Sequence, residues 1–484
     1  MGVIHSLRNM LQPVNRLPPE ILSHVARCIP DEDETDASSI IPVTHVCRYW
    51  RNSITSTPEN WTRVSSKRIG IAELSLNRCK AAPLDLWIHV GQGGITPGFS
   101  DLITPYIQNI KHLNVYSFSP QEKFFQTFED LLPLTPNLQS LTLFGGMVDA
   151  PLDRPNDPCG QLLSSLTSLY LSSVPLYPSF LRLTTLKDFT IHHNRLNLRL
   201  DTLLDFLEQN RSLERAEIDV KFTQDSLLDL RRRAPIKNRL RHLSISSHSA
   251  VDLYAFISNI VIQKGAHLEL GLFDQNTGPE HARSVVSTVH QLNPRSYTSM
   301  EYRPIEGSVR TIQLHGPDGS FSLKRRPAEA PFTEFPLPTL NNIQTFHLKR
   351  NVLDPRARPR FAPTSLPLSF LPALEMLVIE REMDALHLLW ILFSNPSSSR
   401  SLKTLAFFDC YIDDEFMRGL IRFSSNRKGK STTSAPLHRV VIVNSGGRLP
   451  PFTLIDELGK YVPVVDVRVG KVLPSDLRWN GPVE

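Results

Sequence analysis

The chain has 484 residues, a hydrophobic content of 40% and a formal net charge of +5. This length suggests about three domains and a large buried core. The hydrophobic fraction is ordinary for a globular protein, and so small a net charge gives no indication of nucleic acid, which we do not expect as a partner.

The cysteines and the N-terminus give indications of the cellular compartment. The five cysteines, Cys28, Cys47, Cys79, Cys159 and Cys410, are scattered and form no C-x-x-C pair. They predict reduced thiols in a cytoplasmic or nuclear protein. No apolar run is long enough for a membrane span or a secretory signal. Residues 1–14 are expected to be a flexible N-terminus, and the myristoylation pattern at Gly2 is expected to be unused.

Residues 17–29 predict the first helix. Pro18 and Pro19 stand at its start, where the missing N–H costs nothing and φ is already set. Apolar side chains follow at helical spacing, at Ile21, Leu22, Val25 and Ile29. Pro30 is expected to end this helix.

A second and a third helix are expected within the same short segment. Residues 43–54 show a second apolar face, and Thr57 with Pro58 predicts the cap and first position of a short helix carrying Trp61. Residues 31–39 are an acidic insertion between the first two helices, for which we favour a solvated linker over a docking or phosphorylation loop. Three short helices bury little core alone, so a partner surface is expected.

These residues resemble the F-box in the form common in fungal proteins. The likeness covers residues 15–65 and rests on L-P-x-E-I, V-C-R-x-W-R and the final Trp61. It implies a module that docks on a Skp-type adaptor and, through it, a cullin. Matching the motif residue by residue assigns the adaptor contact to Leu17, Pro18, Ile21, Leu22, Val46, Arg48 and Trp50.

Residues 66–100 are expected to form a transition into the rest of the chain. Residues 68–79 predict a helix, and the alternating residues 84–90 predict a strand that leads into a glycine turn at 91–94. The glycines lack the third member of a dinucleotide-binding pattern, so we interpret them as a plain turn.

From residue 101 to 470 the pattern apolar-x-x-apolar-x-apolar recurs. Its first positions at 110, 138 and 166 are 28 residues apart, and those at 186, 213 and 240 are 27 apart. Further copies begin at residues 309, 343, 374, 402, 437 and 462. Such a period indicates a solenoid, and the last two apolar positions predict a half-buried strand.

Residues 201–210 and 251–260 predict helices between these strands. The combination resembles degenerate leucine-rich repeats of the long, helix-bearing type. An irregular insertion is expected around 271–340, with a β-hairpin about Gly316–Gly319 and a loop over 324–338. Residues 471–484 are expected to be a C-terminal tail. The expected fold is therefore α/β, a three-helix F-box followed by a βα solenoid with a curved parallel sheet and outer helices.

No motif of catalysis, metal binding or cofactor binding is found in the sequence. His192-His193 lacks further metal ligands, and basic runs such as residues 427–430 are interpreted as solvated helix ends or loops rather than phosphate or acidic-ligand sites. We therefore expect a protein that is not an enzyme and holds no cofactor or metal.

Two hypotheses about function remain. The first is the substrate-recognition subunit of a Skp–cullin–F-box ubiquitin ligase, with the repeats binding an unknown protein substrate on their concave face. The alternative is a leucine-rich-repeat interaction scaffold that acts outside any ligase. Adaptor capture separates the two.

Overall fold

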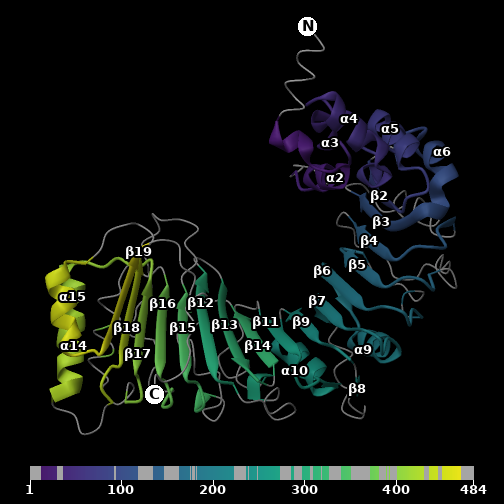
Figure 1. Ribbon diagram of the computed structural model, residues 1–484. Coiled ribbons are helices and arrows are strands. Elements are labelled where there is room, and N and C mark those ends of the chain that lie inside the picture. The colour runs from purple at the N-terminus through teal and green to yellow at the C-terminus, as the bar shows by residue number, and fades with distance from the viewer. Residues whose placement is uncertain are drawn as a thin grey trace. The chain divides into compact units, whose positions relative to one another are not determined.

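The structure is a computed structural model, and its fold is α/β, with an N-terminal helical region and a large, mostly parallel sheet (Figure 1). The described residues are 12–29, 36–91, 94–117, 134–145, 163–174, 176, 180, 182–222, 236–237, 239–247, 249–272, 285–287, 297–305, 309–317, 319–325, 340–349, 371–380, 389, 392, 400–429, 435–444 and 450–469. The Gly2 pattern, residues 31–35 of the acidic insertion, residues 326–338 of the expected loop and the tail at 471–484 lie outside these residues. The described ends of the two segments correct the expectations: Asp36 is buried and lies 3.8 Å from Arg68 rather than in a solvated linker, and Lys324 and Arg325 end a strand rather than begin a loop. The chain divides into two compact units, Met1–Asp229 with Ile236–Arg239, and Leu230–Pro235 with Leu240–Glu484.

The first unit begins with short helices. These are η1 (Pro13–Arg16), α2 (Pro19–Arg27), α3 (Ile40–Val43), α4 (Arg48–Ser56) and η2 (Pro58–Trp61). The start of α2 at Pro19 confirms the expected proline-led helix. The expected second helix is wrong as one continuous element, because the chain leaves the helix after Val43 and Cys47 becomes an extended cap with φ −160°.

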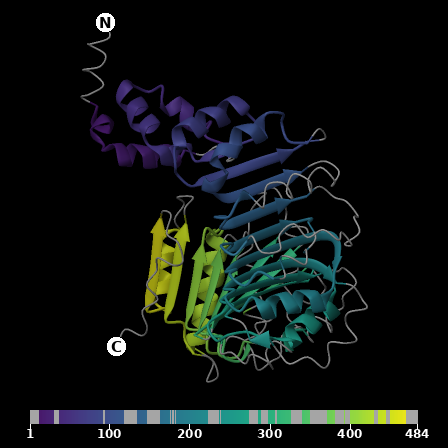
Figure 2. The same ribbon diagram turned by 90° about the vertical axis from the view of Figure 1, so that its right-hand side faces the viewer.

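Parallel strands follow the helices. They are β1 (Arg63–Ser65), β2 (Leu84–Val90), β3 (Ile110–Ser117), β4 (Ser140–Phe144), β5 (Ser168–Ser172), β6 (Asp188–Leu198) and β7 (Arg215–Phe222). Each pairs in parallel with the next along the chain. Figure 2 shows these strands lying side by side in blue to teal. The helices of this region are α5 (Ile69–Cys79), α6 (Phe99–Ile103), η3 (Thr104–Asn109) and α9 (Leu200–Gln209), followed by the short β8 (Ile236–Lys237).

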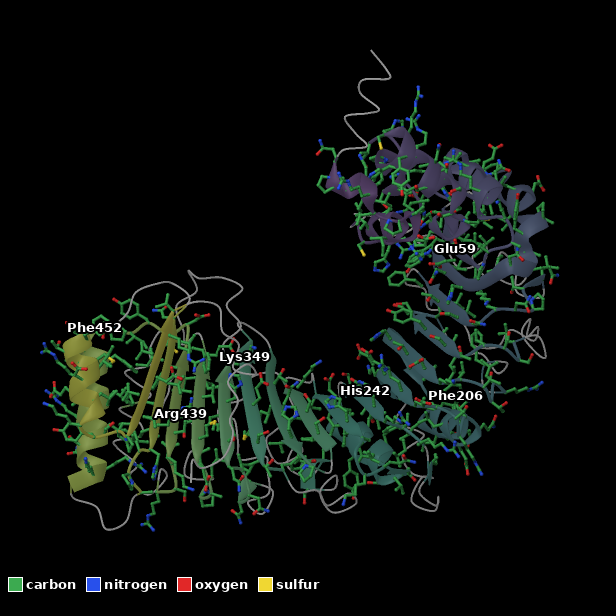
Figure 3. All side chains as sticks on the ribbon, viewed as in Figure 1. Glu59, Phe206, His242, Lys349, Arg439 and Phe452 are labelled. Atoms are coloured by element: carbon green, nitrogen blue, oxygen red, sulfur yellow. The ribbon has the colours of Figure 1, made fainter. Side chains whose placement is uncertain are left out.

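The repeated apolar positions form the core of this unit. Leu141 and Leu143 from β4 are fully buried, and Leu169 and Leu171 from β5 lie beside them in register. Phe206 of α9 packs on Phe189 of β6 with ring centroids 4.4 Å apart. Phe206 is labelled in Figure 3. The alternate residues of the same strands point to the opposite face, as a period of two requires.

The second unit also has a mostly parallel sheet. Its strands are β9 (His242–Ser247), β11 (His267–Leu272), β12 (Ser299–Ile305), β13 (Val309–Gly316), β14 (Gly319–Arg325), β15 (Thr345–Lys349), β16 (Met376–Glu380), β17 (Thr404–Phe408), β18 (Arg439–Asn444) and β19 (Val464–Val469), with the short β10 (Ile260–Val261). The spatial order is β9, β11, β14, β13, β12, then β15 to β19. The helices are α10 (Ala250–Ser258), α14 (Asp414–Gly429) and α15 (Phe452–Gly459).

The hairpin expected within 271–340 is confirmed, because β13 and β14 pair antiparallel around Gly316 and Gly319. The sequence reasoning missed β11 and β12. In β11, Gly265 stands where the pattern places its first apolar residue, whereas Tyr297, Met300 and Tyr302 at β12 have the pattern's spacing with tyrosines in place of aliphatic residues. β12 pairs antiparallel with β13 and parallel with β15, so β13 alone runs in the opposite direction among these neighbouring strands.

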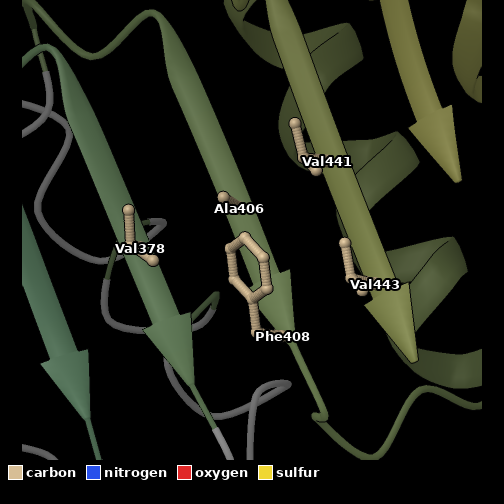
Figure 4. Packing of buried hydrophobic residues seen from close by; sticks show 5 residues of the cluster. All are labelled: Val378, Ala406, Phe408, Val441 and Val443. Carbon is tan, nitrogen blue, oxygen red and sulfur yellow. The ribbon is translucent and has the colours of Figure 1, made fainter. Parts of the chain in front are cut away.

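Apolar residues occupy both faces of the sheet at β16 to β18. Phe407 meets Phe416 of α14 edge-on at 4.9 Å. Alternation therefore puts Ala406 and Phe408 on the face away from α14. They form a buried cluster with Val378, Val441 and Val443, which Figure 4 shows on that face.

Candidate functional site

The N-terminal helices form a module with a small apolar core of its own. Leu22 from α2, Ile54 from α4 and Trp61 from η2 are fully buried, and Trp50 is 9% exposed. Three short elements, α2, α4 and η2, thus share this core. Figure 3 labels Glu59 on η2, at the exposed side of this core.

Side-chain hydrogen bonds fix the module's geometry. Asn60 accepts from Ser23 Oγ at 2.7 Å and donates through Nδ2 to the Ile54 carbonyl at 3.2 Å, so one buried amide joins α2, α4 and η2. The indole Nε1 of Trp61 donates to the same carbonyl at 3.0 Å. A buried polar group costs little once it is paired in this way, and the pairing specifies one arrangement of the helices.

A second set of contacts ties η1 to α4. Trp50 Nε1 donates to Asn15 Oδ1 at 2.6 Å, and the Tyr49 hydroxyl donates to the Leu17 carbonyl at 2.7 Å. These bonds hold the segment before α2 against α4. The module is also joined to the following helix, because the Arg78 guanidinium lies 4.3 Å above the ring of Trp61.

The module exposes apolar side chains on its outside. Ile21, Val25 and Ile29 follow at intervals of four residues along and just beyond α2, and are 47%, 41% and 37% exposed. Val46 is 58% exposed in the turn before α4. We call these four, with Val14 and Tyr49, which are also exposed, the apolar docking surface.

The residues assigned to adaptor binding fall into two groups. Pro18, Ile21, Val46 and Arg48 are exposed, and Leu17 is half-buried. Leu22 and Trp50 instead lie inside the module. Adjacent helix positions are rotated by about 100°, so Ile21 and Leu22 cannot face the same side. Adaptor contact by all seven residues stays a prediction, and the burial of Leu22 and Trp50 favours a supporting role for these two.

Val14 and Tyr49 were missed by the sequence reasoning. Val14 precedes the recognised motif, and Tyr49 stands between two motif residues. The signal available for Val14 was an apolar residue four positions before Pro18, the proline that precedes α2. Nothing local to Tyr49 shows that its ring is exposed while its hydroxyl is held by Leu17.

The described residues offer neither a metal cluster nor a membrane span. Within them, no group of three or more His, Cys, Asp or Glu side chains could hold a metal ion. Among the helices of those same ranges, none is long and apolar enough to cross a membrane. Four cysteines in the described part of the chain, Cys28, Cys47, Cys79 and Cys410, are thiols that form no disulfide.

Comparison with known proteins identifies the helical module. A family model described as F-box-like matches residues 14–67, so the chain carries an F-box-like domain there. The matched segment contains the whole apolar docking surface. A search of curated proteins found no match to the chain. The domain gives the chain a general role in binding the adaptor of a ubiquitin ligase.

Proposed function

We propose that the chain is the substrate-recognition subunit of a Skp–cullin–F-box ubiquitin ligase. The F-box-like module binds a Skp-type adaptor, and the sheet behind it binds a protein substrate. The protein has no catalytic role of its own in this proposal, and it works in the cytoplasm or nucleus, as a reduced set of cysteines suggests. The form of the motif suggests a fungal protein.

The observation that carries the proposal is the apolar docking surface. A set of apolar side chains, each between about a third and three-fifths exposed, gathers on a module already closed around its own core. Exposed apolar groups that surround a well-packed support are typical of interaction sites. Their location inside the F-box-like match supports a Skp-type adaptor as the occupant.

We further propose that the strands belong to degenerate leucine-rich repeats. Backbone hydrogen bonds recur at the entry to each strand: Gln139 N donates to Lys111 O, Thr167 N to Gln139 O, Lys187 N to Thr167 O and Glu214 N to Lys187 O, all at 2.8 Å. A polar residue just before each first leucine also bonds back to the preceding copy. Ser165, Thr185 and Ser212 donate to the carbonyls of Leu138, Leu166 and Leu186. Such step-to-step bonding supports a stacked array.

Adaptor capture by the full chain tests the proposal. In the double variant Ile21→Asp, Val46→Asp we expect at least about a 30-fold loss of affinity. Each side chain has roughly half its surface left to bury, which contributes about 1 kcal/mol, and about 2 kcal/mol in total corresponds to that factor. The measurement is the dissociation constant for a purified Skp-type adaptor.

A matched control is available in the second unit. Val251 and Tyr254 on α10 are 50% and 47% exposed, and Val251→Asp, Tyr254→Asp adds the same charge outside the module. This control is expected to capture adaptor normally. A folded Ile21→Asp, Val46→Asp chain that binds adaptor as well as the control would refute the assignment, and would favour a scaffold acting outside a ligase.

A further inference from the structure

The face of the first sheet opposite its leucine core carries aromatic rings. These residues alternate with the buried positions of β2 to β6, and their side chains are half-buried, with the ring nitrogens of Trp87 and His89 enclosed. We call them the aromatic strip: Trp87, His89, Tyr116, Phe144, Tyr170 and His192. Their strands are paired in register, so the rings come from consecutive strands.

The rings of the strip contact one another. Tyr116 stacks on Trp87 at 5.5 Å with an interplanar angle of 5°, and on Phe144 at 5.7 Å with an angle of 27°. His89 lies 5.5 Å from Tyr116, and Tyr170 lies 5.6 Å from His192. The ring contacts form two groups, one from Trp87 to Phe144 and one of Tyr170 with His192, and such packed aromatic side chains lose little conformational entropy on binding.

The strip ends at two carboxylates on β7. Glu217 lies 3.7 Å from His192 Nε2, and Asp219 lies 3.9 Å from His192 Nδ1. Their side chains remain 47% and 34% exposed. The nearby cation Arg215 is 3.8 Å from Asp188 and so belongs to another pair. We call Glu217 and Asp219 the acidic end.

Carboxylates at both ends of the strip act on its tyrosines. Burial raises the pKa of the Tyr170 hydroxyl, and the charge of Glu217 raises it further. Burial likewise raises the pKa of Tyr116, with contributions from Tyr170 and Asp85. At the other end of the strip, Arg63 and His112 act on Asp85 and moderate its charge. The exposed carboxylates Glu217 and Asp219 therefore mark the β7 end of the strip.

We propose that the aromatic strip and the acidic end bind an extended, arginine-bearing peptide segment of a protein substrate. This inference rests on the proposed receptor function and names the class of substrate. A guanidinium group stacks on aromatic faces and pairs with carboxylates through parallel hydrogen bonds, so it matches both halves of the surface. A purely apolar segment would leave the two carboxylates desolvated without a partner.

The size of the surface sets the length of the segment. From β2 to β7 there are five strand spacings of about 4.8 Å, or roughly 24 Å. An extended peptide advances about 3.3 Å per residue, so about seven residues span it. An arginine near one end of the peptide reaches Glu217 and Asp219, while the remaining residues lie across Tyr116 and Trp87.

Direct peptide binding to the full chain tests the inference without adaptor. The probes are fluorescently labelled peptides of about eight residues, one alternating arginine with leucine and one alternating glutamate with leucine. We expect the arginine peptide to bind at least about tenfold more tightly, and its affinity to fall as salt is raised. The variant Glu217→Gln, Asp219→Asn is expected to lose about tenfold for the arginine peptide, and Tyr116→Ala a similar factor.

Matched controls separate local from general effects. Asp456→Asn, Glu457→Gln removes the same two charges from exposed positions of α15, and Tyr411→Ala removes a 63% exposed ring from the second unit. Both controls are expected to bind like the unchanged chain, and each variant is checked for its thermal midpoint and adaptor capture.

Equal affinity for the two peptides, tighter binding of the glutamate peptide, or equal behaviour of the β7 and α15 variants would overturn the inference. Normal adaptor capture with no peptide discrimination refutes only this inference, whereas lost adaptor capture with intact discrimination refutes only the ligase assignment.

Discussion

Replacing Arg427 by methionine should loosen the C-terminal half of the second unit. Arg427 lies near the end of α14 and is only 7% exposed. Its Nε donates to the Ala435 carbonyl at 2.9 Å, and its Nη2 donates to the Leu402 carbonyl at 2.9 Å. These carbonyls lie just before β18 and β17, so one guanidinium group joins the helix to the entry of two strands.

The magnitude follows from two opposing contributions. Hydrogen bonds from a charged donor contribute about 1.5–3 kcal/mol each, hence about 3–6 kcal/mol for the two. Burial lowers the pKa of Arg427 to about 10, which corresponds to a desolvation cost of about 3 kcal/mol relative to an ordinary guanidinium group. Methionine keeps the apolar stem near Phe423, so the expected net loss is about 2 kcal/mol.

Denaturant unfolding with hydrogen exchange measures this loss. We expect Arg427→Met to lower the unfolding midpoint and to speed amide exchange in β17 and β18. Arg422→Met is the control, because Arg422 is on the same helix and exposed. An Arg427→Met chain that matches Arg422→Met in midpoint and exchange would refute the reasoning.

Two further outcomes are expected. Leu169→Ala should lower the free energy of unfolding by about 2–5 kcal/mol, because the Leu169 side chain on β5 is 1% exposed in the core. The control Thr142→Ala, on the opposite face of the sheet, should lower it much less. Equal thermal midpoints for the two variants would contradict the assigned register. The pKa of His192 is raised, chiefly by Asp219, with Glu217 adding to it against burial. A histidine whose pKa is higher in the folded state stabilises that state at pH values below its unfolded pKa of about 6.5. This stabilisation disappears as the pH rises through the folded-state pKa. His192→Asn should therefore lower the thermal midpoint at pH values below about 6.5 and change it little well above the folded-state pKa. A gap between the thermal midpoints of the two chains that grows with pH would contradict this reasoning.

The strands of the sheet were largely predictable because their pattern is local and redundant. Leu138, Leu141 and Leu143 are all fully buried, and the same three positions recur in the next copy. Side chains alternate between the two faces of a strand, so apolar residues at fixed, alternate positions allow only one of the faces to be buried. The strand β11 escaped because its neighbours in space, β9 and β14, are separated from it by irregular intervals of sequence.

The helical module was predictable as a site and less so in detail. The proline start of α2 depends on φ and a missing donor, both properties of single residues. Whether Leu22 or Ile21 faces outward depends instead on where Ile54 and Trp61 close the core, which is a tertiary property. The interpretation of Arg427 as part of a solvated basic run is wrong for the same reason, because carbonyls distant in sequence remove it from water.

The two units differ in how far the polar side chains of their strands are already paired, and this favours the first unit as the substrate-binding one. In the second unit Glu269 accepts from Lys324 at 2.7 Å and from Ser244 at 3.0 Å. Glu380 lies 3.2 Å from His347 and 3.3 Å from Lys349 with its carboxylate 7% exposed. A ligand there must break pairs whose carboxylates are largely buried, and each broken pair leaves a costly uncompensated charge. In the first unit Glu217 and Asp219 lie 3.7 Å and 3.9 Å from the imidazole of His192 and stay partly exposed. An incoming guanidinium can therefore gain two carboxylate contacts there without losing any of comparable strength.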